Sequence, residues 1–126
     1  MKNLIKAVGG GILGLFTAHN ALENVYLNLM HELTSRDCKV LAQRLSGGRA
    51  KIFKAYMNDP QHSALLGTAS FWEGVDLSGD ALTTLVIHKI PFDVPSDPIY
   101  KVRSKMFNNG FMEYSVPRAV LKFRQG

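Results

Sequence analysis

Long hydrophobic runs and paired cysteines are both missing from this sequence of 126 residues. Its apolar stretches are far shorter than the roughly 20 residues that a membrane-spanning helix needs, and the N-terminus lacks the apolar core of a signal peptide. Because Cys38 is the single cysteine, no internal disulfide and no Cys-rich zinc or iron-sulfur site can form. We therefore expect no membrane contact, a cytoplasmic location, and a buried apolar role for Cys38.

The Walker A pattern G-x-x-x-x-G-K-[ST] is also missing, so this chain has no loop that holds a nucleoside triphosphate by itself. Any nucleotide chemistry would be shared with another domain. A literal G-x-G-x-x-G occurs at Gly9, Gly11 and Gly14, but it precedes a predicted strand, whereas dinucleotide-binding loops follow one. These glycines favour a helix C-cap that leads into a strand. A nucleotide-binding oxidoreductase domain remains an alternative hypothesis.

Residue types that build metal or hydrolytic sites lack the required spacing. The four histidines are scattered along the chain, and His88 lies within an apolar run. No serine occupies a nucleophile elbow. The sequence therefore predicts neither a metal centre nor hydrolysis by a Ser-His-Asp triad.

What the sequence does have is an ordinary globular composition, with 46% hydrophobic and 20% charged residues and a net charge of +5. Residues 39–54 and the last 26 residues are basic, whereas acidic residues gather between them. Two basic segments beside an acidic one fit a polyanion-binding rim next to a loop that faces a nucleotide. Solvated helix faces would have the same composition. The basic candidates for nucleic-acid contact are Arg44, Arg49 and Lys51.

Apolar runs and helical periodicity alternate along the chain. Strands are predicted at residues 12–17, 39–43, 64–68 and 82–90. Helices are predicted from a capping-box-like start at residues 20–23, around Ile52 and Tyr56, from Pro98 with a face of Ile99, Val102 and Met106, and from Pro117. Buried strands alternating with helices predict an α/β fold with a mainly parallel sheet and helices on both faces. We expect a single domain over residues 1–126.

The segment after the third predicted strand, residues 66–79, combines hydroxyl side chains, glycines and carboxylates. Thr68 and Ser70 can donate hydrogen bonds to phosphate oxygens, and glycines let backbone amides approach a ligand. Asp76 can accept from a hydroxyl such as that of a ribose, and Glu73 can orient basic neighbours. An ordinary polar turn would use some of the same residue types, so these residues alone leave the role of the loop open.

Residues 67–76, which read GTASFWEGVD, resemble motif V of superfamily-two helicases of the DinG/XPD type. Residues 15–18, LFTA, resemble their motif IV. Residues 87–98 are similar to the strand and Pro-rich turn that follow motif V in DinG-like proteins. Residues 123–126, FRQG, look like the opening of motif VI, whose arginines would follow Gln125. The resemblance therefore identifies the chain as the second RecA-like domain of a DNA helicase, truncated within motif VI.

This resemblance implies that ATP lies between two RecA-like domains, with its phosphates and Mg²⁺ held mainly by the first, which is absent here. Gly74 and Asp76, with Glu73, would face the nucleotide, and Gln125 would open the catalytic motif VI. Thr17, Thr68 and Ser70 would lie nearer the single-stranded DNA. We expect the chain alone to be inactive, because the arginines that stabilise phosphoryl transfer are missing. Whether the parent protein holds an iron-sulfur cluster stays open.

Besides the oxidoreductase alternative, two functions compete. The first is half of an ATP-dependent helicase motor, in which cleft closure moves this domain along single-stranded DNA. The second is a non-catalytic nucleic-acid-binding module that kept the fold and lost the motor. A DNA-stimulated ATPase activity of the parent protein would separate them.

Overall fold

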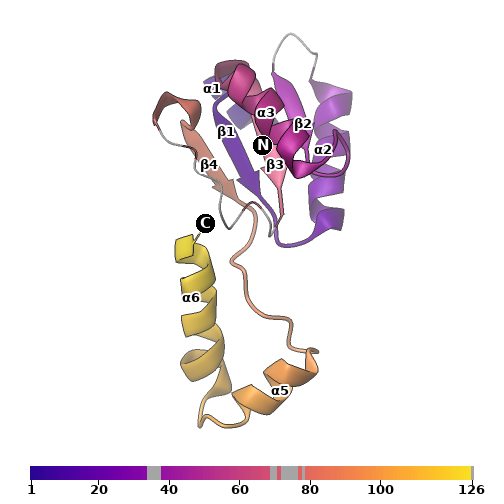
Figure 1. The fold of residues 1–126 in the computed structure, drawn as a ribbon. Coiled ribbons are helices and arrows are strands. Elements are labelled where there is room, and N and C mark those ends of the chain that lie inside the picture. The colour runs from indigo at the N-terminus through magenta and orange to yellow at the C-terminus, as the bar shows by residue number, and fades with distance from the viewer. Residues whose placement is uncertain (34–37, 69–70, 72–76, 78, 126) are drawn as a thin grey trace. The chain divides into compact units, whose positions relative to one another are not determined.

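Four short apolar segments form a parallel sheet within residues 1–88 (Figure 1). The strands are β1 (Ile12–Leu15), β2 (Lys39–Ala42), β3 (Ser63–Gly67) and β4 (Thr84–Ile87), in the spatial order β2-β3-β1-β4. Every pair of neighbouring strands is parallel, so their carboxyl ends meet at one edge. Every residue of the two central strands is buried, as their continuous apolar runs predict. The structure is a computed structural model that describes residues 1–33, 38–68, 71, 77 and 79–125.

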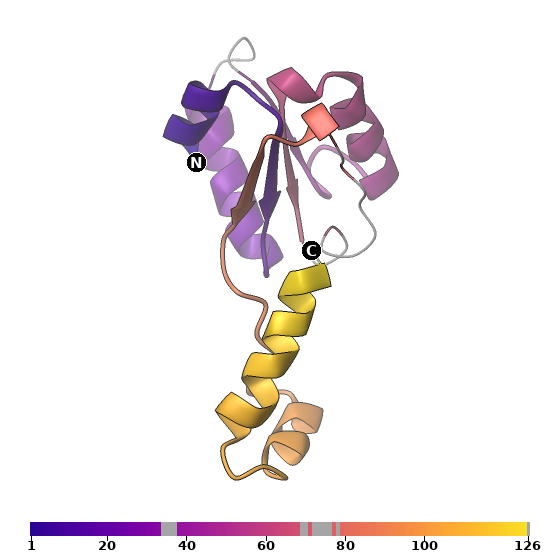
Figure 2. The ribbon, with the colours of Figure 1, turned by 90° about the vertical axis from the view of Figure 1, so that its left-hand side faces the viewer.

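Helices cover both faces of this sheet, as predicted (Figures 1 and 2). Because successive strand residues point to opposite faces, Ile12 and Phe16 pack on one side and Leu13 and Leu15 on the other. The first side is covered by α1 (Lys2–Val8) and α2 (His19–Glu32), and the second by α3 (Arg49–Asn58). Cys38 is 4% exposed within the first layer, which confirms its predicted apolar role. The three-layer α/β fold is therefore confirmed.

The predicted start of α2 at a capping box is wrong. The helix begins at His19, its N-cap residue is Ala18, and no side chain caps it. The N–H of Leu22 already donates to the carbonyl of Ala18 at 3.3 Å, so Asn20 lies inside the first turn and cannot cap it. The strands are also shorter than predicted at 12–17 and 82–90, because β1 and β4 pair only from Ile12 to Leu15 and from Thr84 to Ile87.

Residues 89–126 form a second compact unit, which contains α5 (Pro98–Ser104), the π-helical turn η3 (Phe111–Ser115) and α6 (Val116–Gln125). The helix α5 begins at Pro98, as predicted, and Asp97 caps it, since its Oδ1 accepts from the backbone N–H of Ile99 at 2.7 Å and of Tyr100 at 3.2 Å. The prediction of a single domain over residues 1–126 stays a prediction. Among the described residues, no helix combines the length and apolarity that crossing a membrane requires.

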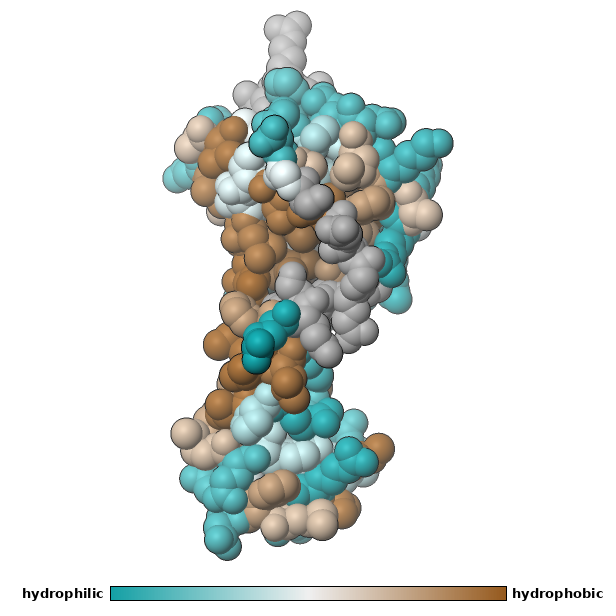
Figure 3. Space-filling model, turned by 60° about the vertical axis from the view of Figure 1, so that its left-hand side comes forward, coloured by the Kyte–Doolittle hydropathy of each residue, from teal (hydrophilic) through white to brown (hydrophobic). Residues whose placement is uncertain are grey.

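The predicted apolar face of α5 is not buried. Ile99, Val102 and Met106 are 62%, 66% and 78% exposed. The helix instead contacts η3 through Tyr100, which hydrogen-bonds to Ser115 and whose ring lies against that of Tyr114. Many more large apolar side chains are exposed on this chain, and Figure 3 shows such apolar surface in brown on one face of the molecule.

One ion-pair cluster ties the beginning of the second unit to α6. The carboxylate of Asp93 accepts from Nε of Arg118 at 2.5 Å and from Nζ of Lys122. The hydrogen bonds from these two cations lower the pKa of Asp93 below its ordinary value. A carboxyl group with a lowered pKa stabilises the folded state above its unfolded pKa of about 3.9, and this stability is lost as the pH falls through the folded value.

We expect Asp93→Asn to lower the free energy of unfolding at neutral pH by about 1 kcal/mol, because both partners are partly exposed and solvent weakens the pairs. The difference between the two proteins should shrink at a second, acidic pH that lies below the lowered pKa of Asp93, where the native carboxyl group is also protonated. Urea unfolding followed by circular dichroism at both pH values measures this. A difference that stays the same at both pH values would mean that the charge of Asp93 contributes nothing.

Candidate functional site

The carboxyl edge of the sheet gathers polar side chains from segments that are far apart in the sequence. Backbone bonds fix this edge: the N–H of Phe16 donates to the carbonyl of Gly67, and that of His88 to the carbonyl of Leu15, both at 2.9 Å. In open parallel sheets, ligands bind outside this edge. The residues that follow the four strands there include Thr17, Gln43, Thr68 and His88.

Thr68 is the centre of a hydrogen-bond network at this edge. It is 7% exposed, and both its backbone N–H and its Oγ1 donate to Oε1 of Gln43 at 2.9 Å. Its Oγ1 also lies 3.3 Å from Nε2 of His19, the first residue of α2. The network therefore connects the ends of β2 and β3 with the start of α2. Buried polar groups with several partners fix the geometry of a site.

The sequence predicts that Thr68 donates to a phosphate, and the structure shows that its hydroxyl proton is directed at Gln43 instead. Direct contact of Thr68 with nucleic acid stays a prediction. Sequence reasoning missed Gln43 and His19 as partners of this threonine. The available signal was position, because Gln43 ends one predicted strand and His19 comes two residues after another. Thr17 is exposed at the same edge, where a ligand can reach it.

Arg44 lines a cleft of about 310 Å³ beside this network. Its backbone has a φ of 71°, in the left-handed region, and its N–H donates to the carbonyl of Gly47 at 3.0 Å. A non-glycine residue in this region is uncommon and marks a constrained turn. The same cleft is lined by His19, Asn20, Leu22, Glu23, Gln43 and Leu45. The structure thus brings one predicted basic residue together with the Thr68 network.

Arg49 and Lys51 lie on the exposed surface of α3. The guanidinium of Arg49 lies 5.6 Å from the centre of the Phe71 ring, within cation–π distance. Lys51 packs beside the turn that Arg44 begins, since a Cβ atom added at Gly47 would lie 2.9 Å from its Cδ. Arg44 therefore lines the cleft, Lys51 packs against the turn that Arg44 begins, and Arg49 is engaged with an aromatic ring.

The residues predicted to face the nucleotide, Glu73, Gly74 and Asp76, lie outside the described residues. Ser70, which is predicted to lie nearer the single-stranded DNA, lies outside them too. Gln125 is the last residue of α6, and its side chain is not among the parts that the structure describes. Within the described part of the chain, no group of three His, Cys, Asp or Glu side chains could hold a metal ion. The roles of these five residues stay predictions.

The Thr68 network leads to a specific expectation. Thr68→Val keeps the shape of the side chain but removes the hydroxyl, so Gln43 and His19 lose a buried partner and the unfolding free energy should fall by about 1–3 kcal/mol. Thr68→Ser keeps the hydroxyl and should retain most of this stability. Thermal unfolding of the two variants, compared with the parent chain, measures the effect. A larger loss in Thr68→Ser than in Thr68→Val would assign the role of Thr68 to its methyl group.

Comparison with known proteins gives matches along the whole chain. Residues 1–126 match a family model described as the helicase C-terminal domain. "ATP-dependent DNA helicase YoaA" of Escherichia coli is 41% identical over 130 residues, which covers 100% of this chain and 20% of that protein. "3'-5' exonuclease DinG" of Bacillus subtilis is 41% identical over 91% of the chain and 13% of that protein.

A third relative, "ATP-dependent helicase DinG" of Mycobacterium tuberculosis, is 33% identical over 100% of this chain and 19% of its own length. The chain therefore spans between about an eighth and a fifth of the curated relatives that it matches. The matched region is common to relatives whose names differ.

Proposed function

Since this chain belongs to the family of helicase C-terminal domains, we propose that it is the second RecA-like domain of a DinG-like, ATP-dependent DNA helicase. In this role it would bind single-stranded DNA and move along it as ATP is hydrolysed. The match over residues 1–126 with relatives named ATP-dependent helicases carries the proposal. A cytoplasmic location stays a prediction.

The geometry of the sheet edge supports this assignment. The network of Thr68, Gln43 and His19 holds the ends of two strands and the start of a helix in fixed positions. Thr17 and Arg44 are exposed beside it and offer a hydroxyl and a guanidinium. Such groups bind the phosphate backbone of nucleic acids without reading the sequence. We infer that this edge contacts the DNA strand, with the Thr68 network as its support.

ATP would be shared with a first RecA-like domain, which would hold the phosphates and Mg²⁺. From this side, we propose that Asp76 accepts from a nucleotide hydroxyl, that Gly74 lets the backbone approach, and that Glu73 orients basic neighbours. Gln125 would open the motif whose arginines complete the site. Closing and reopening the cleft between the domains would shift the fixed sheet edge along the strand. No iron-sulfur cluster is assigned to this chain, whose single cysteine is buried in an apolar layer, and whether the full-length protein holds one stays open.

The non-catalytic binding module is the competing hypothesis, and the names of the relatives favour the motor. The Bacillus subtilis relative is named an exonuclease, and the region that matches this chain makes up about an eighth of that protein. We therefore do not assign nuclease chemistry to the matched region.

ATP hydrolysis by the full-length protein that carries this chain, measured with and without single-stranded DNA, tests the proposal. We expect the DNA to stimulate turnover strongly. Folded protein that hydrolyses no ATP under either condition would leave the binding module as the better assignment.

A further inference from the structure

The positive charge of this chain is concentrated in its second unit. Residues 89–126 contain seven Lys and Arg against three Asp and Glu, whereas residues 1–88 contain eight against seven. The proposed contacts at the sheet edge therefore leave most of the net charge of +5 without a role. A local excess of basic residues attracts polyanions.

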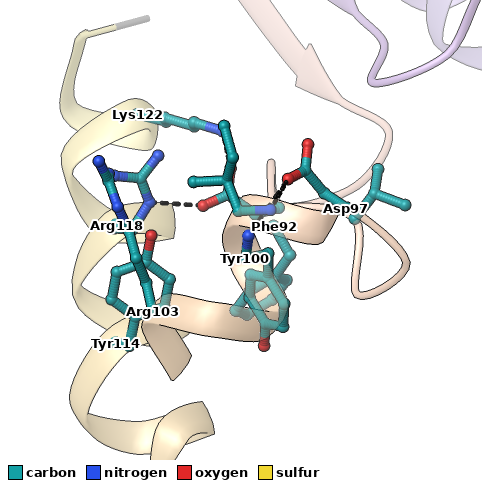
Figure 4. A pocket seen from close by; sticks show the side chains of 10 residues that line it. Phe92, Asp97, Tyr100, Arg103, Tyr114, Arg118 and Lys122 are labelled. Atoms are coloured by element: carbon teal, nitrogen blue, oxygen red, sulfur yellow. Dashed lines mark hydrogen bonds and ion pairs between the residues drawn. The ribbon is translucent and has the colours of Figure 1, made fainter. Parts of the chain in front are cut away.

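Within this unit, α5, η3 and α6 enclose a cleft of about 410 Å³, which we call the aromatic-basic cleft (Figure 4). In Figure 4, side chains from α6 and η3 face those from α5 and the segment before it. The cleft is lined, among others, by Phe92, Tyr100, Arg103, Tyr114, Arg118 and Lys122.

The charges in this cleft do not cancel. Asp93 is paired with Arg118 and Lys122, and the carboxylate of Asp97 accepts the backbone N–H groups of α5. With Asp97 counted, three cations and two carboxylates line the cleft, so its net charge is +1, and Arg103 is the cation outside the Asp93 cluster. Within the described residues, Arg103 has no ion-pair partner, and it is exposed. An anionic group that enters the cleft would therefore meet the unpaired guanidinium of Arg103, beside two cations that Asp93 holds in place.

Aromatic rings are interleaved with these cations. The guanidinium of Arg118 lies 5.3 Å from the centre of the Tyr114 ring, and Tyr114 is stacked with Phe107 at 5.6 Å. Phe92 is stacked with Phe111 at 5.6 Å and remains 42% exposed at the cleft. Rings held rigidly by other rings form a stacking surface at little cost in side-chain entropy.

We propose that the aromatic-basic cleft is a second binding site for single-stranded nucleic acid, in which a base stacks on Phe92 and the adjoining phosphate pairs with Arg103. Grooves that combine cations with exposed aromatic rings bind single strands in this way, independently of sequence. The inference rests on the proposed function for its choice of polymer. It adds a contact in residues 89–126 that the sheet edge in residues 1–88 does not supply.

Binding of a fluorescent oligothymidylate to the 126-residue chain, measured by anisotropy over a range of salt concentrations, tests the site. Arg103→Ala should weaken binding about fivefold at about 0.1 M salt and lower the salt slope by about 0.7, the value for one phosphate contact with a single strand. Lys101→Ala is the matched control, because Lys101 lies on the same helix with the same charge but does not line the cleft. It should leave the slope unchanged.

Phe92→Leu keeps an apolar side chain and removes the ring, so it should weaken binding by about fivefold or more without changing the salt slope. Circular dichroism of each variant checks that it is folded. Equal losses in Arg103→Ala and Lys101→Ala would show diffuse attraction and overturn the site. Unchanged affinity in Phe92→Leu would also overturn it, and would leave a peptide segment as the better occupant. Displacement of the oligothymidylate by an equal concentration of free ATP would show a mononucleotide site instead.

Different combinations of results would show whether this inference or the proposed function is wrong. If cleft variants bind the oligothymidylate normally while DNA stimulates ATP hydrolysis by the full-length protein, the second site is wrong and the motor stands. If the full-length protein hydrolyses no ATP while Arg103→Ala and Phe92→Leu weaken binding as expected, the motor is wrong and the cleft stands.

Discussion

In the full-length protein that carries this chain, Asp76→Ala is expected to lower DNA-stimulated ATP hydrolysis by about tenfold to a hundredfold. The proposal places the Asp76 carboxylate against a nucleotide hydroxyl. A hydrogen bond to a charged group contributes about 1.5–3 kcal/mol, and each 1.4 kcal/mol corresponds to a factor of ten. Steady-state hydrolysis at saturating single-stranded DNA, measured over a range of ATP concentrations, gives kcat and KM separately.

Asp80→Ala is the matched control for this experiment. Asp80 belongs to the same acidic segment and is exposed in the 3₁₀ turn η2 (Gly79–Ala81), where its backbone carbonyl, not its carboxylate, accepts from Gln61. Its substitution removes the same charge and should leave turnover unchanged. Equal losses in both variants would assign the effect to the net charge of the segment and would remove Asp76 from the nucleotide site.

The sheet was predictable from the sequence because its strands are buried on both faces. In β3 the run from Ala64 to Leu66 has no exposed position, and a short continuous apolar run is the signature that this burial leaves. Strand ends were less predictable, since they depend on where the neighbouring strand stops. The run of residues 82–90 continues past β4, but β1 offers it paired residues only as far as Leu15.

The glycines near the N-terminus also behave as the sequence interpretation predicts. Gly9 is the C-cap of α1 with a φ of 84°, and its N–H donates to the carbonyl of Ile5 at 2.8 Å. Gly14 lies in β1, where an added Cβ would come within 2.8 Å of a methyl carbon of Leu66. A helix cap and strand packing account for these positions, so the literal G-x-G-x-x-G pattern needs no dinucleotide.

Contacts between side chains that are far apart in the chain could not be predicted from the sequence. Gln43 and Thr68 are 25 positions apart, and so are Asp93 and Arg118. Residue type and periodicity specify which positions face a core, but they do not specify which polar groups meet across it. The same limit applies to the helix that begins at Pro98, because helical spacing places Ile99, Val102 and Met106 on one apolar face but does not specify what covers it, and the structure leaves all three exposed.

Gly10→Ala is expected to lower the unfolding free energy by about 2–3 kcal/mol, the upper part of the usual cost of an overpacked interior. An added Cβ would lie 2.1 Å from the carbonyl oxygen of Gln61 and 2.4 Å from its carbonyl carbon. Both are backbone atoms, so no side-chain rotation relieves the contact. The neighbouring bond from the N–H of Gly11 to the carbonyl of Pro60, at 2.6 Å, holds the two segments together and opposes a shift of either.

Gly48→Ala separates this steric effect from the general cost of replacing glycine. Gly48 is the N-cap residue of α3 with a φ of −70°, and an added Cβ there has no atom within 4 Å. Alanine adopts this backbone without strain, so the unfolding free energy should change by about 0.5 kcal/mol or less. Urea unfolding of both variants measures the two values under one condition. Similar values for the two variants would mean that the chain before β1 moves away from Gln61 at little cost. The close approach of these backbones would then not limit which residue can occupy position 10, just before the central strand.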